Sequence, residues 1–298
     1  MTTAIVPIAA YPATSVSNAD ARTCLGHIMT LFTSAGLVQT SDTGQTTTST
    51  YVTPGANSDG GYLIYRFNDS VQSTDPLFIK VFVGAGNPTA NLRLRIQLGQ
   101  GTNGAGTLTG TLSSTTAVAG GSSYNNSTYS TTSYACHTEG FFGAMIAPGT
   151  SISLPRISFT ISRTRNASYA FDGLGSVLWT DNVNSYGAIA FTRYANNAFT
   201  GINSGQYCLV PGVPTSTALL NGDKQLYPHF YADPDVKQLW SQFTVSYLET
   251  TTVPASFTAV PINNQSRTFF FLGSTAAATA PIANIHNNGN FRLAMLWE

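Results

Sequence analysis

The sequence predicts a mainly β protein, namely an antiparallel β-sandwich or jelly-roll-like domain with one N-terminal amphipathic helix at about residues 18–36. Segments that alternate between apolar and polar residues recur along the 298 residues, and turns rich in Gly, Pro, Asn and Ser separate them. Only one segment carries a convincing helical stripe. Together these observations are typical of antiparallel sheets.

Residues 1–17 are predicted to form an extended arm, because Pro7 and Pro12 prevent a helix. Such an arm is ordered only when it lies against something. It docks either on a neighbouring subunit or on its own β-rich domain, residues 18–298, which can divide into two sub-domains. Its apolar anchors, our candidate assembly contacts, are Ile5, Val6, Ile8 and Tyr11.

The helix follows directly. Asn18 is the expected N-cap, Asp20 complements the helix dipole in the first turn, and Gly36 stands where a C′ glycine belongs. His27 lies beside the apolar stripe and is expected to be partly exposed. The stripe itself consists of Ala21, Cys24, Leu25, Ile28, Leu31, Phe32 and Ala35.

The rest of the chain is predicted to be β. Pro155 interrupts the alternation of its segment, which indicates a bulge or an edge strand. The predicted strands are residues 61–67, 77–83, 92–98, 151–161, 186–194, 205–210, 240–248, 267–272 and 290–297.

Residues 107–136 form a polar loop region, because they almost lack large aliphatic side chains. Two alternatives stay open for it: a solvated insertion, or a contact loop of the Tyr, Ser, Gly and Asn type that binding loops favour. The segments 163–185 and 195–204 have the same composition. The candidate loop contacts are Tyr124, Tyr129 and Tyr134.

Gly99, Gly101 and Gly104 match the G-x-G-x-x-G pattern of dinucleotide-binding turns. Such a site needs a helix after the glycines, whereas "TLTGTLSSTTAVAGGSS" is rich in poor helix formers. The preceding strand carries Arg93 and Arg95 and is therefore half exposed, unlike a Rossmann strand. We therefore predict a β-turn or hairpin here and no nucleotide cofactor.

The charge content narrows the function classes. Charged residues make up 9% of the chain, with 13 basic and 13 acidic side chains, so a basic stripe for nucleic acid or a polybasic membrane patch is not expected. Low net charge favours association, which suits a fixed assembly. The N-terminus lacks a basic n-region and its apolar run is short, which predicts neither a signal peptide nor a membrane span, and hence synthesis in a cytosol.

Groups suited to catalysis are few. Cys136 and His137 are neighbours, but adjacent residues on a strand point to opposite faces. Asp233 and Asp235 lack the further ligands of a calcium loop, and the three cysteines show no zinc or disulfide spacing. Only a spatial meeting of Glu139 with Glu249 stays open as a glycosidase pair. We predict no enzyme activity, no catalytic residue, no cofactor and no metal.

The order of segments resembles a type of tailed-bacteriophage virion protein. The similarity lies in "IMTLFTSAGLVQTSDTGQ", "GYLIYRFNDSVQSTDPLFIKVFVGAG", "LRIQLGQGTNGAGTLTG" and the closing "FRLAMLWE". The resemblance implies a structural component of the particle, made in the host cytoplasm and located in the virion, with no catalytic residues.

Two hypotheses then compete. The first is a building block of a tail, neck, baseplate or fibre, with capsid decoration as its variant; its partners are other virion proteins and copies of itself, and a trimer is the preferred state. The second is a module whose Tyr-rich loops bind a host-surface glycan.

Overall fold

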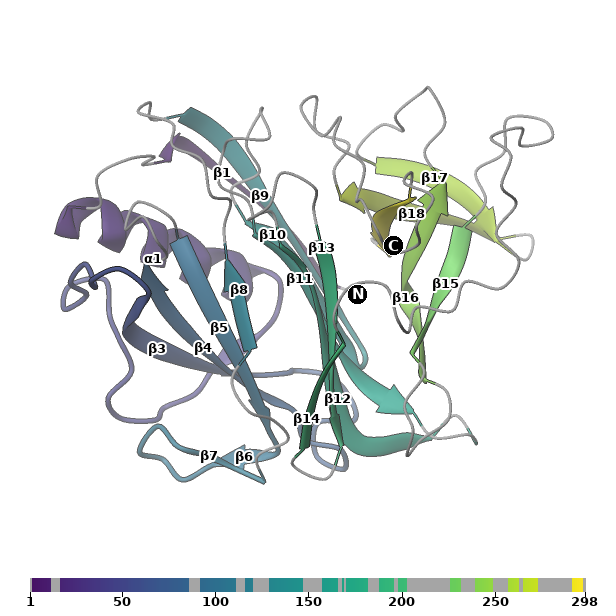
Figure 1. The fold of residues 1–298 in the computed structure, drawn as a ribbon, viewed down its shortest axis with the longest axis horizontal. Helices are drawn as coiled ribbons and strands as arrows, with labels where there is room; N and C mark the ends of the chain where they lie inside the picture. The colour runs from purple at the N-terminus through teal and green to yellow at the C-terminus, as the bar shows by residue number, and fades with distance from the viewer. Residues whose placement is uncertain are drawn as a thin grey trace.

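The computed structural model describes residues 2–11, 17–85, 92–110, 116–119, 129–146, 157–165, 168, 170–181, 188–195, 198–202, 226–231, 239–248, 257–262, 265–272 and 291–296. These residues form antiparallel sheets and one helix, which confirms a mainly β protein (Figure 1). The elements are β1 (Thr2–Tyr11), α1 (Asn18–Ser34), β2 (Val38–Gln39), β3 (Ser58–Arg66), β4 (Phe78–Ala85), β5 (Leu92–Gly99), β6 (Gly101–Thr102), β7 (Leu108–Thr109), β8 (Thr116–Ala119), β9 (Tyr129–Thr138), β10 (Phe141–Ile146), β11 (Ile157–Arg165), β12 (Phe171–Asp181), β13 (Ala188–Ala195), β14 (Ala198–Ile202), β15 (Leu226–Tyr231), β16 (Leu239–Leu248), β17 (Phe257–Ile262), β18 (Gln265–Leu272) and β19 (Phe291–Leu296).

The largest sheet has seven strands in the order β1-β9-β10-β11-β12-β13-β14. From β9 onward each strand pairs with the next one in the chain, so local hairpins build most of the sheet. Strand β1 lies at the edge beside β9, with Val6 opposite Ser133. The edge strand β1 is therefore paired with β9, a strand far from it in the sequence.

A five-stranded sheet with the order β2-β3-β4-β5-β8 lies opposite (Figure 1). Strand β5 alternates as predicted, since Leu94, Ile96 and Leu98 are buried while Arg93 and Arg95 are half-buried on the other face. A separate five-stranded sheet has the order β15-β16-β19-β18-β17.

The N-cap of α1 is Ser17, one residue before the expected Asn18, and Asn18 is the first helical residue. The Ser17 hydroxyl accepts from the Asp20 N–H at 3.2 Å, and the Asp20 carboxylate accepts from the Ser17 N–H at 3.2 Å. This reciprocal capping box needs an acceptor side chain three residues after the cap, and counting from Asn18 would place an alanine there. Gly36, with φ +96°, ends the helix as predicted.

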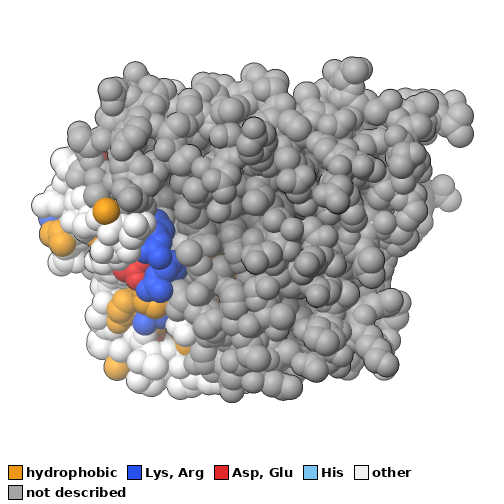
Figure 2. Space-filling view, in the orientation of Figure 1, with side chains coloured by type: hydrophobic (Ala, Val, Ile, Leu, Met, Phe, Trp, Pro, Cys, Tyr) orange, Lys and Arg blue, Asp and Glu red, His pale blue; other side chains and the backbone are white. Residues whose placement is uncertain are grey.

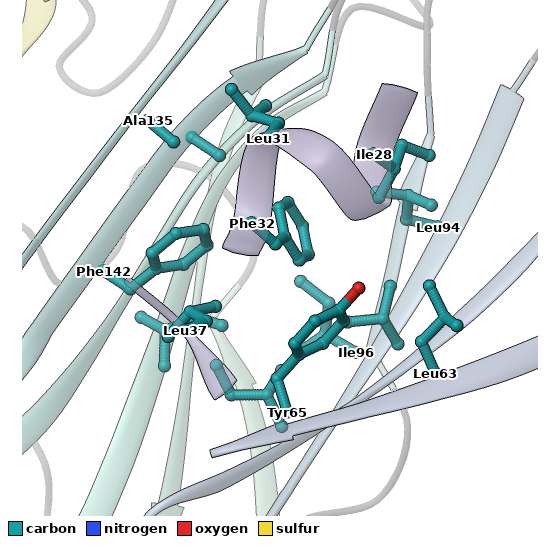
Figure 3. Packing of buried hydrophobic residues seen from close by; sticks show 14 of the residues in the cluster. Ile28, Leu31, Phe32, Leu37, Leu63, Tyr65, Leu94, Ile96, Ala135 and Phe142 are labelled. Carbon is teal, nitrogen blue, oxygen red and sulfur yellow. The ribbon is translucent and has the colours of Figure 1, made fainter. Parts of the chain in front are cut away.

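The hydrophobic core joins α1 to both of the first two sheets. The ring of Phe32 contacts Tyr65 of β3 at 5.4 Å between centroids and Phe142 of β10 at 5.1 Å, both edge to face (Figure 3). Such aromatic pairs contribute roughly 0.5–1.5 kcal/mol each beyond their burial. Helix and sheets therefore share one hydrophobic core in this part of the chain.

Three segments predicted as polar loops contain strands instead. Strand β8 lies within residues 107–136, and β9 begins in that segment. Strand β12 lies within 163–185, and β14 lies within 195–204. Their Thr, Ser and Tyr residues have high or tolerable strand propensity without being aliphatic. In β9 the small residues Thr131 and Ser133 are buried on the side where α1 packs, which explains the lack of large side chains.

The glycine motif is a hairpin, as predicted. Gly101 begins β6, which pairs with β7, and Gly104 lies in the connecting turn with φ +77°. No helix follows the motif within the described residues up to 119. The predicted strand at 205–210 lies outside the described residues.

Candidate functional site

The candidate assembly contacts of the arm lie on strand β1, which pairs with this chain's own β9. This placement is the second of the two alternatives for the arm. Val6 and Ile8 pack against the core, whereas Ile5 points outward and is 56% exposed. Tyr11 ends the strand opposite Tyr129. A contact of Ile5 with another subunit stays a prediction.

The candidate loop contacts are not together in a loop. Tyr129 and Tyr134 belong to strand β9, and Tyr124 lies outside the described residues. Tyr134 is half-buried between Ile5 and Met145 in the strand register, and burial raises its pKa. The sequence of β9 is typical of a loop, because this polar, tyrosine-containing strand lacks the alternation of large apolar residues that predicts a strand.

The thiol and imidazole at positions 136 and 137 do not form a reactive pair. Burial raises the pKa of Cys136 to about 12, so the thiolate is strongly disfavoured at neutral pH. His137 faces the core, where its ring meets Phe67 edge to face at 5.0 Å. Glu139 is exposed and accepts a hydrogen bond from the Ser70 hydroxyl at 2.8 Å, while Glu249, Asp233 and Asp235 lie outside the described residues.

His27 is buried, not partly exposed as expected. Its Nε2 lies 2.6 Å from the Ser133 hydroxyl on β9, and burial lowers its pKa. The position next to the stripe faces β9, so α1 contacts the seven-stranded sheet with more of its surface than the apolar stripe. This polar contact joins helix and sheet rather than forming an accessible site.

A buried ion pair fixes the loop between β3 and β4. The guanidinium of Arg163 on β11 contacts the Asp69 carboxylate, donates to the Gln72 side-chain oxygen at 2.6 Å, and donates to the Asp75 carbonyl at 2.7 Å. The Gly140 N–H donates to the same carboxylate at 3.0 Å. The Arg163 and Asp69 side chains are only 2% and 5% exposed, so this cluster is structural.

The outer face of the five-stranded sheet β2-β3-β4-β5-β8 carries a different cluster, which we call the cation–aromatic row. Basic side chains gather here around an acidic one, with aromatic rings beside them (Figure 2). The strand register brings them together, since Tyr62, Phe82 and Arg95 lie opposite one another on three neighbouring strands. The row consists of Asp59, Tyr62, Lys80, Phe82, Arg93 and Arg95.

Each long side chain of the row is held by its neighbours. The ammonium of Lys80 lies 3.9 Å from the Tyr62 ring centroid and donates to the Gly106 carbonyl at 2.6 Å. The Arg95 guanidinium lies over Phe82 at 4.7 Å and binds the Asp59 carboxylate through its Nε and Nη2. Cation–π contacts of this kind contribute about 0.5–1 kcal/mol at exposed sites.

The edge of the row is fixed by a turn. The Tyr62 hydroxyl donates to the Thr43 carbonyl at 3.0 Å and lies where a side chain at Gly106 would stand. Arg93 donates to the Asn57 carbonyl at 2.8 Å and lies 3.8 Å from Asp59. The row is thus a rigid surface of aromatic rings and cations rather than a set of free side chains.

The sequence carries one signal for the row, which is a local concentration of charge. Lys80, Arg93 and Arg95 fall within 16 positions of a chain in which 9% of residues are charged. All three occupy the half-buried positions of β4 and β5. Their convergence became visible only with the pairing of the strands.

The described residues hold no group of three or more His, Cys, Asp and Glu side chains that could bind a metal ion. Within the same residues, no helix has the length and apolar character needed to cross a membrane. Comparison with protein families, with curated proteins and with solved structures finds no match.

Proposed function

We propose that this chain is a non-enzymatic structural component of a bacteriophage virion, belonging to a tail, neck, baseplate or fibre. The order of its segments resembles such proteins, above all in residues 28–110. The observation that carries the proposal is the cation–aromatic row. Arg and aromatic side chains are the residues that dominate protein contact surfaces, and here they are fixed in place before any partner binds.

The use of charge supports the same function. The ion pair of Arg163 with Asp69 holds the loop between β3 and β4. The ion pair of Arg95 with Asp59 orders the outer face of the sheet that contains β5. Charges used in this way stiffen a scaffold, and a scaffold with low net charge associates readily.

We infer that the two sheets around α1 form a β-sandwich. The core that their side chains share supports this arrangement. The sequential hairpins from β9 to β14 favour a meander-based sandwich over a jelly roll, whose Greek-key connections place distant strands side by side.

The test is the location and copy number of the chain in purified phage particles, by quantitative mass spectrometry and a cryo-electron microscopy map. We expect many symmetric copies, and light scattering of the isolated chain at about three times its 31.5 kDa mass for the preferred trimer. Absence from washed particles, or degradation of capsule or cell wall by the pure protein, contradicts the proposal. A few copies at a distal tip that bind host envelope would favour the glycan-binding module instead.

A further inference from the structure

We propose that the cation–aromatic row binds carboxylates on the surface of another protein. The inference rests on the row itself and holds whether or not the chain is a virion component.

The first support is an excess of positive charge. The row holds the cations Lys80, Arg93 and Arg95 against the single carboxylate of Asp59. Asp42 is buried, accepts from the Gly106 N–H at 3.2 Å and also acts on Lys80 through its charge, so three cations face two carboxylates and one positive charge is in excess. A positive surface therefore remains on a chain whose formal net charge is zero.

The second support is unused donors at both ends of the row. Among the described residues, the Arg93 guanidinium with its five N–H donors makes one hydrogen bond, to the Asn57 carbonyl, and lies 3.8 Å from the Asp59 carboxylate. The Lys80 ammonium has three donors and makes one hydrogen bond within the described part of the chain, to the Gly106 carbonyl. Arg95, by contrast, is committed to Asp59 through several contacts. Arg93 and Lys80 are thus the groups that can donate further hydrogen bonds to an anionic partner.

The strand register sets the spacing of those two groups. Arg93 lies opposite Gly84 on β4, four residues beyond Lys80. Their backbone positions are therefore roughly 13 Å apart, with the ring of Phe82 between them. A partner that places acidic side chains at both ends would span a centre in which the Phe82 ring lies beneath the Arg95 guanidinium.

The chemistry of the row favours protein carboxylates over other anions. Asp59, which lies level with Arg93 at one end of the row, repels a continuous phosphate backbone, and nucleic-acid binding needs several cations in line. Stacking of a sugar needs a free aromatic face, but Lys80 covers the Tyr62 ring and Arg95 covers the Phe82 ring. A discrete carboxylate needs no aromatic face, and it meets Asp59 only at the Arg93 end of the row, without a line of further negative charges beside it.

The experiment uses the full chain and a fluorescent peptide of Ser and Glu with glutamates four residues apart. Fluorescence anisotropy at about 0.01 M ionic strength is expected to show binding that weakens by about 0.15 M, and a matched Ser and Gln peptide is expected not to bind. Lys80→Gln and Arg93→Gln are each expected to weaken binding roughly fivefold, whereas Arg93→Lys retains most of it.

Arg22→Gln on α1 is the matched control, because it removes one cation away from the sheet face. Thermal unfolding checks that each variant keeps its fold. The inference is overturned if the glutamate peptide does not bind, if the Gln peptide binds equally, or if the row variants behave like Arg22→Gln. It is also overturned if a heparin oligosaccharide or an oligothymidylate binds more tightly than the peptide.

Discussion

Arg163 on β11 and Asp69 in the loop after β3 form a buried ion pair although they are 94 residues apart in the sequence. The pair ties the loop between β3 and β4 of one sheet to the β9–β10 turn and β11 of the other, because the Gly140 N–H donates to the same carboxylate. The contribution of this ion pair to stability depends on both partners, since removal of one leaves an uncompensated charge out of contact with water.

We expect Arg163→Leu to lower the free energy of unfolding by about 3–5 kcal/mol, because the Asp69 carboxylate is then buried without a countercharge. The double variant Arg163→Leu with Asp69→Leu is expected to recover a large part of that loss. Urea unfolding measures both. Equal losses for the single and double variants would show that the pairing itself is not the stabilising feature.

Tyr65→Phe is expected to raise the free energy of unfolding by about 1 kcal/mol. The Tyr65 hydroxyl points into the apolar cluster and has no hydrogen-bond partner among the described residues (Figure 3). Tyr62→Phe is the control, because it deletes a hydroxyl that does donate, to the Thr43 carbonyl, and should lower stability by about 1 kcal/mol. If both variants changed the free energy of unfolding in the same direction, the buried Tyr65 hydroxyl would not be the cause of the effect.

Stability is expected to fall as the pH drops from about 6.5 to about 4. Burial lowers the pKa of His137 to about 4; the Asp69 charge opposes this effect and the Arg163 charge adds to it. The unfolded chain binds the proton more readily below pH 6.5, so up to about 3 kcal/mol is lost by pH 4. Urea unfolding of the wild type and of His137→Gln across this range should show a shallower pH dependence for the variant. The pH dependence that remains in the variant includes a contribution from His27, whose pKa is also lowered by burial.

Gly106→Ala is expected to destabilise the fold more than Gly104→Ala. Both glycines have positive φ, +83° and +77°, so both variants incur backbone strain of about 1–2 kcal/mol. A Cβ at Gly106 would also meet the Tyr62 hydroxyl, whereas one at Gly104 meets nothing within 4 Å. Thermal unfolding of the pair isolates that contact, and equal midpoints would disprove it.

Ile5→Asp and Ala4→Asp separate assembly from folding. Ala4 is buried in the core, so a charge there should unfold the N-terminal part of the chain. Ile5 is exposed, so Ile5→Asp should change stability by less than about 0.5 kcal/mol while weakening self-association seen by light scattering. An Ile5→Asp variant that assembles normally would remove Ile5 from the predicted contacts.

The helix and strands β3 to β5 could be predicted because each has one buried face and one wetter face, and periodicity records that difference. Strand β10 could not, since all its residues are buried and the run "FFGAMI" has no alternation. In β9 the inner residues facing α1 are small or polar, so the pattern resembled a loop.

The site was predicted less completely than the fold. The half-exposed character of Arg93 and Arg95 was visible from alternation alone. Their alignment with Phe82 and Asp59 depends on the pairing of three strands and on the register shift between Asp59 and Gly61, which local sequence does not encode. The burial of His27 likewise depends on a strand about a hundred residues later.

The pairing of β1 with β9 has a consequence for biosynthesis. About 120 residues separate the two strands, so the first strand emerges from the ribosome well before the strand it pairs with. At translation speeds of about 5–20 residues per second, its apolar face stays exposed for roughly 6–25 s. During that interval a chaperone, or the same segment of a neighbouring nascent chain, competes for it.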